Sequence, residues 1–304
     1  MYYFSIPDSS KTRVGNMAML HLMREYPEWF YDDFKIDVAY GCPPSCIWNG
    51  GRAENGDRYS QLEFASVINL FKNHGVKYRL NFTNQCLKEE HLSDGYGNAI
   101  AEVVNDFGGE VAATLSLMTD YMANKYSNLD IVWSTSTDYG QSVDERIERI
   151  NQLLKKYKVV LPYNFNNTAD LDKFKCPENI EILVCDGCKD NCELRSQHQL
   201  MVSQSIIRGV FDENLNYCQR NADGNVKSLL EQDVSHFRSS VGRNKLPWYA
   251  DKGINKFKIL GRDCVISIFI EGLVDYLIKP EYQEEVRQDL LRRVLTREIF
   301  EKKP

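Results

Sequence analysis

The feature that most constrains the fold is an alternation of strand-like and helical segments along most of the chain. Short runs rich in β-branched, aliphatic and aromatic residues recur, and most are followed by a longer stretch with helical periodicity. The predicted strands are residues 35–40, 77–82, 110–116, 130–134, 158–162, 180–184, 235–239 and 256–260. The predicted helices are residues 16–25, 60–74, 98–105, 117–126, 143–156 and 193–204. A helix between two strands makes them parallel, and about eight such units close a sheet on itself. The pattern therefore predicts an α/β fold, a (β/α)8-type, TIM-like barrel with some irregular units.

The C-terminal part of the chain departs from this alternation. Residues 264–278 are almost entirely apolar and predict a buried helix, whereas residues 281–303 are charged and periodic and predict a surface helix. Pro280 separates the two. Because no repeat, low-complexity tract or linker divides the chain, we predict one barrel domain over 1–304 with a C-terminal helical extension at 265–304. The surface helix is expected to pack on the barrel or on a second copy, which would give a homo-oligomer.

Composition and charge narrow the class of protein. The chain has 304 residues, 43% of them hydrophobic, and a net charge of −6, so it can bury a large core and carries no basic footprint for nucleic acid. No stretch reaches the ~18 apolar residues of a membrane span, and the first ten residues lack the pattern of a secretory signal. Nine cysteines are an odd number in a chain too long for a disulfide scaffold. We therefore expect reduced thiols, a cytoplasmic protein and no membrane or nucleic-acid partner.

Cysteines gather directly after the predicted strand 180–184. The run CDGCKDNC holds Cys185, Cys188 and Cys192, and a more distant candidate is Cys218. Four thiolates are the usual ligands of a [4Fe–4S] cluster, and they can equally close a tetrahedral zinc site. Cysteine is also common as a small buried hydrophobic residue. The residues leave all three interpretations open. His198, six residues past Cys192, is a further possible ligand or a plain surface residue.

Polar side chains recur where the predicted strands end, which is where barrel enzymes carry their working residues. These positions are rich in amides and hydroxyls and poor in carboxylates, a composition that suits recognition of a polar ligand, although the same residues also form turns. They are Asn81, Thr83, Asn84 and Cys86; residues 134–137; Tyr163, Asn164 and Asn166; and residues 261–264. We expect Asn81, Asn84 and Asn164 to orient a ligand, with Asn84 close to the chemistry.

Two arginines are candidates for binding an anion. Arg262 follows Gly261 at the end of the last predicted strand, where a guanidinium can hold a carboxylate or phosphate in bidentate fashion or form a salt bridge within the barrel. Arg52 follows two glycines whose backbone N–H groups could approach an anion. Just before them, Cys42 and Cys46 in GCPPSC are a redox pair, additional ligands or two unconnected thiols in a proline-restrained loop.

Two of these segments resemble a known family. The segment ADKGINKFKILGRDC (250–264) is similar to a motif of the U32 peptidase-like family, and IEILVCDGCKDNC (180–192) is similar to its iron–sulfur region. The resemblance implies a barrel-like catalytic domain with a [4Fe–4S] cluster, held here by Cys185, Cys188, Cys192 and Cys218. Characterised members mostly act in oxygen-independent hydroxylation of tRNA or rRNA bases and of ubiquinone precursors. Here the first two candidate ligands are more tightly spaced, the later cysteine pair is absent, and no basic appendage suits RNA.

We therefore expect a U32-like iron–sulfur enzyme that carries out a redox or oxygen-independent hydroxylation step on a small polar or anionic substrate. Arg262, Arg52 and Asn84 are the residues expected at the chemistry. One alternative is a zinc-stabilised barrel that serves as a binding module. Another is a hydrolase, as the family label suggests, although the sequence shows no nucleophile–base motif. The histidines are scattered at His21, His74, His91, His198 and His236.

Overall fold

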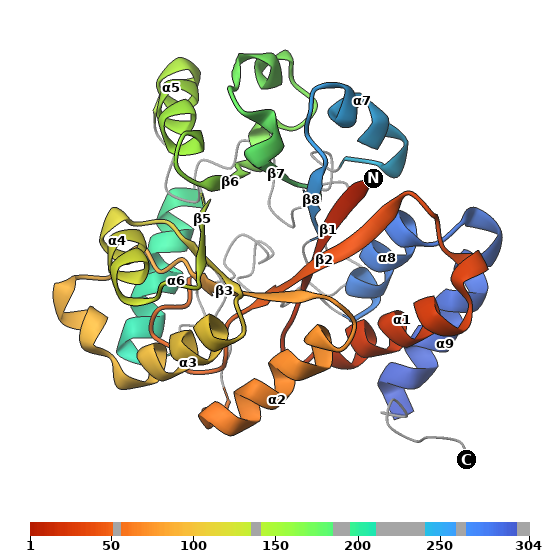
Figure 1. Ribbon diagram of the computed structural model, residues 1–304, viewed down its shortest axis with the longest axis horizontal. Coiled ribbons are helices and arrows are strands. Elements are labelled where there is room, and N and C mark those ends of the chain that lie inside the picture. Colours follow the sequence, from red (N-terminus) through yellow and green to blue (C-terminus); the bar gives the residue numbers. More distant parts are fainter. Residues whose placement is uncertain (51–55, 135–140, 185–194, 211–240, 260–265, 297–304) are drawn as a thin grey trace, which may run out of the picture.

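Eight parallel strands close into a barrel (Figure 1). The computed structural model describes residues 1–50, 56–134, 141–184, 195–210, 241–259 and 266–296. Its strands are β1 (Tyr2–Pro7), β2 (Phe34–Gly41), β3 (Lys77–Phe82), β4 (Glu110–Ala113), β5 (Asp130–Ser134), β6 (Lys158–Leu161), β7 (Ile180–Leu183) and β8 (Lys256–Lys258). Each strand pairs with the next, and β8 pairs with β1. The predicted (β/α)8-type barrel is confirmed.

The set of strands differs from the prediction at one place. The segment Tyr2–Pro7 is a strand that the sequence pattern did not reveal, and it closes the barrel by pairing with both β2 and β8. The predicted strand 235–239 lies outside the described residues. β7 and β8 pair directly, with Glu181 opposite Lys256, so the barrel has no position for a strand between them. The expected number of strands is right because the missed strand replaces the extra one.

Helices surround the barrel, and the predicted ones lie within a few residues of their expected positions; the short helix Leu246–Asp251 was not predicted. The helices that follow β1 to β5 in order are α1 (Arg13–Glu25), α2 (Gln61–Lys72), α3 (Gly95–Asp106), α4 (Ser116–Lys125) and α5 (Val143–Leu154). The later helices are α6 (Arg195–Arg208), α7 (Leu246–Asp251), α8 (Ile266–Leu277) and α9 (Gln283–Thr296). The 3-10 turns are η1 (Pro27–Trp29), η2 (Glu89–Ser93), η3 (Tyr163–Phe165), η4 (Ala169–Lys173), η5 (Pro177–Asn179), η8 (Arg243–Lys245) and η9 (Pro280–Tyr282). Three of these turns stand where a helix would follow β6, so this unit of the barrel is irregular.

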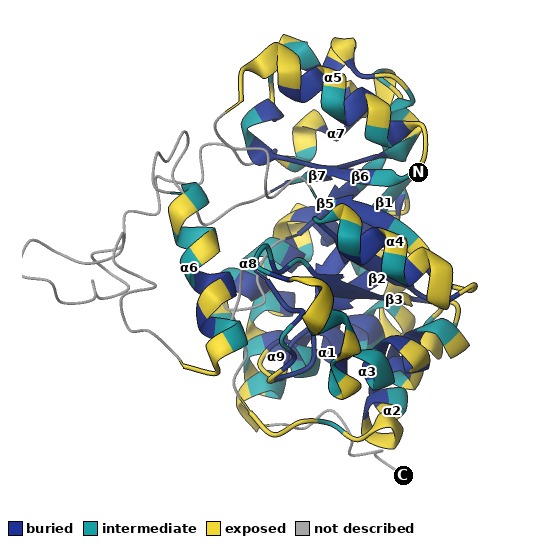
Figure 2. Ribbon diagram, turned by 90° about the vertical axis from the view of Figure 1, so that its left-hand side faces the viewer, coloured by how far each residue is buried: buried dark blue, intermediate teal, exposed yellow. Residues whose placement is uncertain are grey.

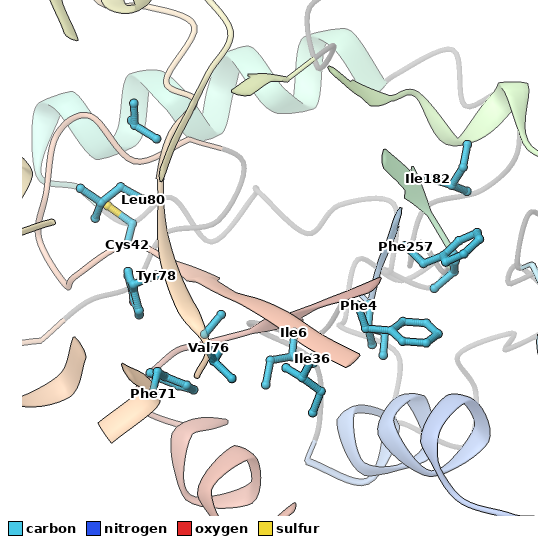
Figure 3. Close-up of a cluster of buried hydrophobic side chains, with 14 of the residues drawn as sticks. Phe4, Ile6, Ile36, Cys42, Phe71, Val76, Tyr78, Leu80, Ile182 and Phe257 are labelled. Atoms are coloured by element: carbon cyan, nitrogen blue, oxygen red, sulfur yellow. The ribbon is translucent and has the colours of Figure 1, made fainter. Parts of the chain in front are cut away.

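The main hydrophobic core lies between the outer face of the barrel and the helices. Alternate strand residues point outward, and Phe4, Ile36 and Phe257 are among those buried there (Figure 3). The rings of Phe4 and Phe257 have centroids 5.8 Å apart. Figure 2 shows that the helices bury the face toward the strands and expose the other. This amphipathic arrangement is what the helical periodicity predicts.

The C-terminal helices pack against the start of the chain. α9 lies beside α1 and α8 (Figure 1), and it buries Val286 and Leu290 fully. The predicted helix 281–303 is therefore η9 followed by α9 up to Thr296, the last residue described.

In the part of the chain that the structure describes, no helix combines the length and apolar character needed to cross a bilayer.

Candidate functional site at the carboxyl end of the barrel

Inward-pointing side chains lie in levels along the barrel axis, because the strands tilt and alternate strands contribute to each level. The strand register assigns these levels from the amino end to the carboxyl end. The first holds Val38, Glu110, Lys158 and Lys256; the second Ser5, Arg79, Val132 and Glu181; the third Tyr40, Ala112, Val160 and Lys258; and the fourth Pro7, Asn81, Ser134 and Leu183. The third and fourth levels lie toward the carboxyl end, where barrel enzymes carry their chemistry.

The first two levels form a buried ion network that sequence reasoning missed. Arg79 Nε lies 2.7 Å from a carboxylate oxygen of Glu110, and the same guanidinium also pairs with Glu181. Lys158 Nζ contacts Glu110 at 2.7 Å. Burial would raise the pKa of Glu110, but Arg79 and Lys158 outweigh it and lower this pKa to about 2. A sequence pattern that could have revealed this network is the alternation of polar Arg79 and Asn81 with Tyr78, Leu80 and Phe82. The network lies away from the carboxyl end, and we assign it to stability.

The third and fourth levels carry a different set of groups. Lys258 Nζ lies 3.9 Å from the centroid of the Tyr40 ring, and the Tyr40 hydroxyl donates a hydrogen bond to the Ile259 carbonyl at 2.5 Å. Lys258 is 9% exposed and Tyr40 is 1% exposed. Asn81 is 3% exposed, and its Oδ1 has no hydrogen-bond partner in the described part of the chain. Asn81 was predicted from its place at a strand end, whereas Lys258 was not.

Helix α6 crosses the carboxyl end instead of packing beside the strand it follows. In Figure 2 it stands across the strand ends, on the side opposite the N-terminus. At its first residue, the Arg195 guanidinium lies 4.2 Å from the ring centroid of Tyr163, which follows β6. Further along, Ser203 accepts hydrogen bonds from Asn84 Nδ2 at 3.0 Å and from the Gln85 N–H at 3.2 Å. Because β3 and β6 lie on different sides of the barrel, α6 spans its carboxyl end.

Asn84, the predicted catalytic amide, fastens this helix. It is fully buried, and its Nδ2 also donates to the Ile47 carbonyl at 2.9 Å. Its Oδ1 accepts from the Cys86 N–H at 2.9 Å. The structure thus places Asn84 at the expected end of the barrel with its amide engaged in holding α6 and the neighbouring loops. A contact between Asn84 and a substrate stays a prediction.

The other predicted amides also have protein partners. Asn164 Oδ1 accepts from Arg146 of α5 at 2.8 Å, and Asn166 Nδ2 donates to the Leu183 carbonyl at 2.7 Å. Gly50 lies so close to the next loop that a Cβ there would be 2.1 Å from the Thr83 carbonyl oxygen. The close approach of these two loops is therefore reason enough for a glycine at position 50.

Most of the predicted ligands lie outside the described residues. These are Cys185, Cys188, Cys192, Cys218, Arg52 and Arg262, together with residues 135–137 and 261–264. The described residues that flank the cysteine run and Arg262 are at the carboxyl end: the Val184 N–H donates to the Lys258 carbonyl at 3.0 Å, and the Ile259 N–H donates to the Ser5 carbonyl at 2.9 Å. Within the described residues, no group of three or more side chains suits a metal ion.

Cys42 and Cys46 are the two thiols of the proline-restrained loop. Cys42 and Cys46 are buried and are not joined in a disulfide. Burial, with smaller contributions from these two cysteines, raises the pKa of the nearby Tyr96 to about 12.

The rings of His21 and His74 have centroids 5.5 Å apart, and they lie near helix C-termini at the amino end of the barrel. His91 Nδ1 accepts from the Lys88 N–H, His198 lies on α6, and His236 is outside the described residues.

Comparisons with known proteins found distant structural similarities and no sequence match. No protein-family model matches the chain, and no curated protein matches its sequence. Among solved structures, the U32 peptidase Mk0906 is 11% identical, with 86% of this chain and 93% of that chain covered and a TM-score of 0.49. A xylose isomerase domain containing protein from Salmonella typhimurium is 10% identical over 96% of both chains, with a TM-score of 0.42. The 3-keto-D-glucoside 4-epimerase YcjR from E. coli is 9% identical, over 97% of this chain and 100% of that one, with a TM-score of 0.35. Similarities this distant carry no argument about substrate or reaction, and the fold of this chain rests on its own strand pairing.

Proposed function

We propose that this chain is a U32-like iron–sulfur enzyme that acts on a small polar or anionic substrate at the carboxyl end of its barrel. The observation that carries the proposal is the position of the cysteine run in the chain. It begins at the residue after Val184, where β7 has just ended, and it is followed by Arg195, where α6 begins. Both flanking elements belong to the end of the barrel at which such folds carry their chemistry. A metal-binding loop at this position would adjoin the substrate.

The donor set suits an iron–sulfur cluster. Cys185, Cys188, Cys192 and Cys218 would supply the four thiolates of a [4Fe–4S] cluster, which would provide one-electron transfer for a redox or oxygen-independent hydroxylation step. The chain's own residues would do the rest. Arg262 and Arg52 would bind the anionic part of the substrate, and Asn84 would keep α6 over it. Zinc is the second candidate, because the same four thiolates can form a tetrahedral structural site; the barrel would then be a binding module.

The remaining expectations stand as proposals of the same kind. A cytoplasmic location is supported by the described cysteines, none of which is joined in a disulfide, as a reducing compartment favours. Self-association through the C-terminal helices is a further proposal. A hydrolase is not favoured, because the described histidines do not gather around a nucleophile.

The test is metal and sulfide analysis of the full chain purified without oxygen, together with a visible spectrum. We expect about four irons and four sulfides per chain, as a [4Fe–4S] cluster requires. A Cys188→Ser, Cys192→Ser double variant should lose both the iron and the colour. Cys176→Ser is the matched control, because Cys176 precedes β7 at the amino end of the barrel; it should keep both. Stoichiometric zinc in the wild type, or unchanged iron in the double variant, would refute the iron–sulfur assignment.

A further inference from the structure

We propose that Lys258 and Asn81 form a binding subsite for a small hydroxylated anion inside the carboxyl end of the barrel. The ligand class has an anionic oxygen group, a carboxylate or a phosphate, next to a hydroxyl group. The subsite belongs to the substrate site proposed above, but it needs no metal at the cysteines.

Lys258 supplies the positive charge. It lies on β8 between Phe257 and Ile259, which are fully buried on the outer side of the barrel, so its own side chain points inward. Its Nζ lies over the Tyr40 ring, 3.9 Å from the centroid. The negative face of the ring favours the charged ammonium at a site with little access to water. In the two levels nearest the carboxyl end, Lys258 is the one charged inward side chain that the described strands contribute.

Asn81 supplies the second group. It lies on β3 between Leu80 and Phe82, which are fully buried on the outer side, so the Asn81 amide also points inward. Its Oδ1 has no partner in the described part of the chain. A buried amide oxygen without a hydrogen bond is destabilising, and most native buried polar groups are satisfied. An amide oxygen requires a donor, and a ligand hydroxyl is one.

The two groups lie at adjoining levels of the barrel interior. Tyr40 contacts Lys258 directly, and it lies on β2, the strand that pairs with β3. Asn81 is one level nearer the carboxyl end than Tyr40 and Lys258. A ligand that reached Lys258 with its anionic group would therefore present its neighbouring atoms at the level of Asn81. Because the Lys258 ammonium donates and the Asn81 Oδ1 accepts, the pair selects an anion with a hydroxyl over an anion without one.

The test compares matched probes that differ in one hydroxyl group. Binding of malate and succinate, and of glycerol phosphate and inorganic phosphate, is measured by calorimetry at constant ionic strength. The wild type is expected to bind malate, glycerol phosphate or both at millimolar concentrations or tighter, and each more tightly than its partner without the hydroxyl. The pair that binds distinguishes a carboxylate from a phosphate. No binding of any probe, or equal binding within both pairs, would overturn the proposal.

Three variants assign the binding to the two residues. Lys258→Met should weaken binding by about ten- to a hundredfold, as expected for losing a hydrogen bond to a charged group. Asn81→Leu should bring malate down to the affinity of succinate. Lys256→Met is the control, because Lys256 is an inward lysine of the same strand at the amino end; it should bind like the wild type. If Lys258→Met binds like the wild type, the subsite is not at Lys258.

A measurement on the wild type covers the case in which a core variant does not fold. Lysine acetylation is followed by peptide mass mapping with and without the bound probe. The probe should slow acetylation of Lys258 and leave that of Lys256 unchanged. Equal rates at Lys258 with and without the probe would refute the assignment. Because none of these measurements depends on iron, a failed metal test leaves this proposal standing, and the reverse is also true.

Discussion

Individual buried charges in this protein are kept inside the barrel by partners of opposite sign. Glu110 is 1% exposed and lies between Arg79 and Lys158, each 2.7 Å away. Removing one member of such a group leaves an uncompensated buried charge, which typically costs 3–5 kcal/mol. The network is therefore stable only while all of its charged members are present. Protonation of Glu110 removes one of these charges, so the stability of the protein depends on pH.

We predict that stability falls as Glu110 is protonated. Its pKa is about 2 in the folded protein against an ordinary value of 4.5, so its contribution is complete above about pH 4.5 and is lost as the pH falls toward 2. The loss should be about 2 kcal/mol by pH 3. Urea unfolding at pH 6 and pH 3 measures it. Glu110→Gln should show a smaller difference between these two pH values, and the exposed Glu102→Gln should behave like the wild type. An unchanged pH dependence in Glu110→Gln would contradict the prediction.

At the scale of elements, α6 is the unusual part of the barrel. The helices after β1 to β5 are placed by the apolar stripe that each presents to the strands. α6 instead buries Val202, Ser203 and Ser205 and is joined by hydrogen bonds to the loop after β3. Its position therefore depends on a few polar contacts, with Asn84 at their centre.

We predict that Asn84→Ala loosens α6 without disturbing the other helices. The substitution leaves the Ser203 and Ile47 carbonyls without their donor, at about 1–3 kcal/mol for each buried group that stays unsatisfied. Amide hydrogen exchange should become faster in 195–208 and stay unchanged in α5. Asn164→Ala is the matched control, since it loses a hydrogen bond to Arg146 of α5 and none to α6. Unaltered protection of α6 in Asn84→Ala would show that other contacts hold this helix.

For the whole molecule, the first elements of the chain and the described C-terminal helices pack in one region. β1 closes the barrel, α1 covers it, and α9 packs on α1 and α8. The C-terminal helices are therefore attached to the part of the barrel that forms from the first residues of the chain. If the chain forms one domain over 1–304, as predicted from the sequence, the C-terminal helices should unfold together with the barrel. Unfolding experiments can test this prediction.

We predict a single unfolding transition that includes the C-terminal helices. Leu290 is fully buried, so Leu290→Ala should lower the unfolding free energy by about 2–5 kcal/mol. Leu295 on the same helix is 77% exposed, and Leu295→Ala should stay within about 0.5 kcal/mol of the wild type. Circular dichroism and tryptophan fluorescence should report the same midpoint in each protein. An early, separate transition in Leu290→Ala would show that the helices form an independent unit.

Local patterns were enough to predict most of the elements and the kind of fold. Helical periodicity and short apolar runs depend on neighbours in the sequence, and they located seven of the eight strands and every described helix except the short α7 to within a few residues. Tyr2–Pro7 was missed because no helix precedes it to mark it as part of the alternation. The strand-end positions of Asn81, Asn84 and Asn164 were also predicted, since a strand's end can be estimated from its pattern.

The sequence by itself determined that the chain is a parallel α/β barrel with polar groups at its strand ends and a cysteine run after the strand predicted at 180–184. Only the tertiary structure decided what those groups do. It engaged Asn84 with Ser203, more than a hundred residues away, and left Asn81 Oδ1 without a partner among the described residues. It also brought Arg79, Glu110 and Glu181 together from three strands, and placed Lys258 over Tyr40. The physical reason is that these contacts depend on the register and tilt of the closed barrel, which bring together residues far apart in the chain.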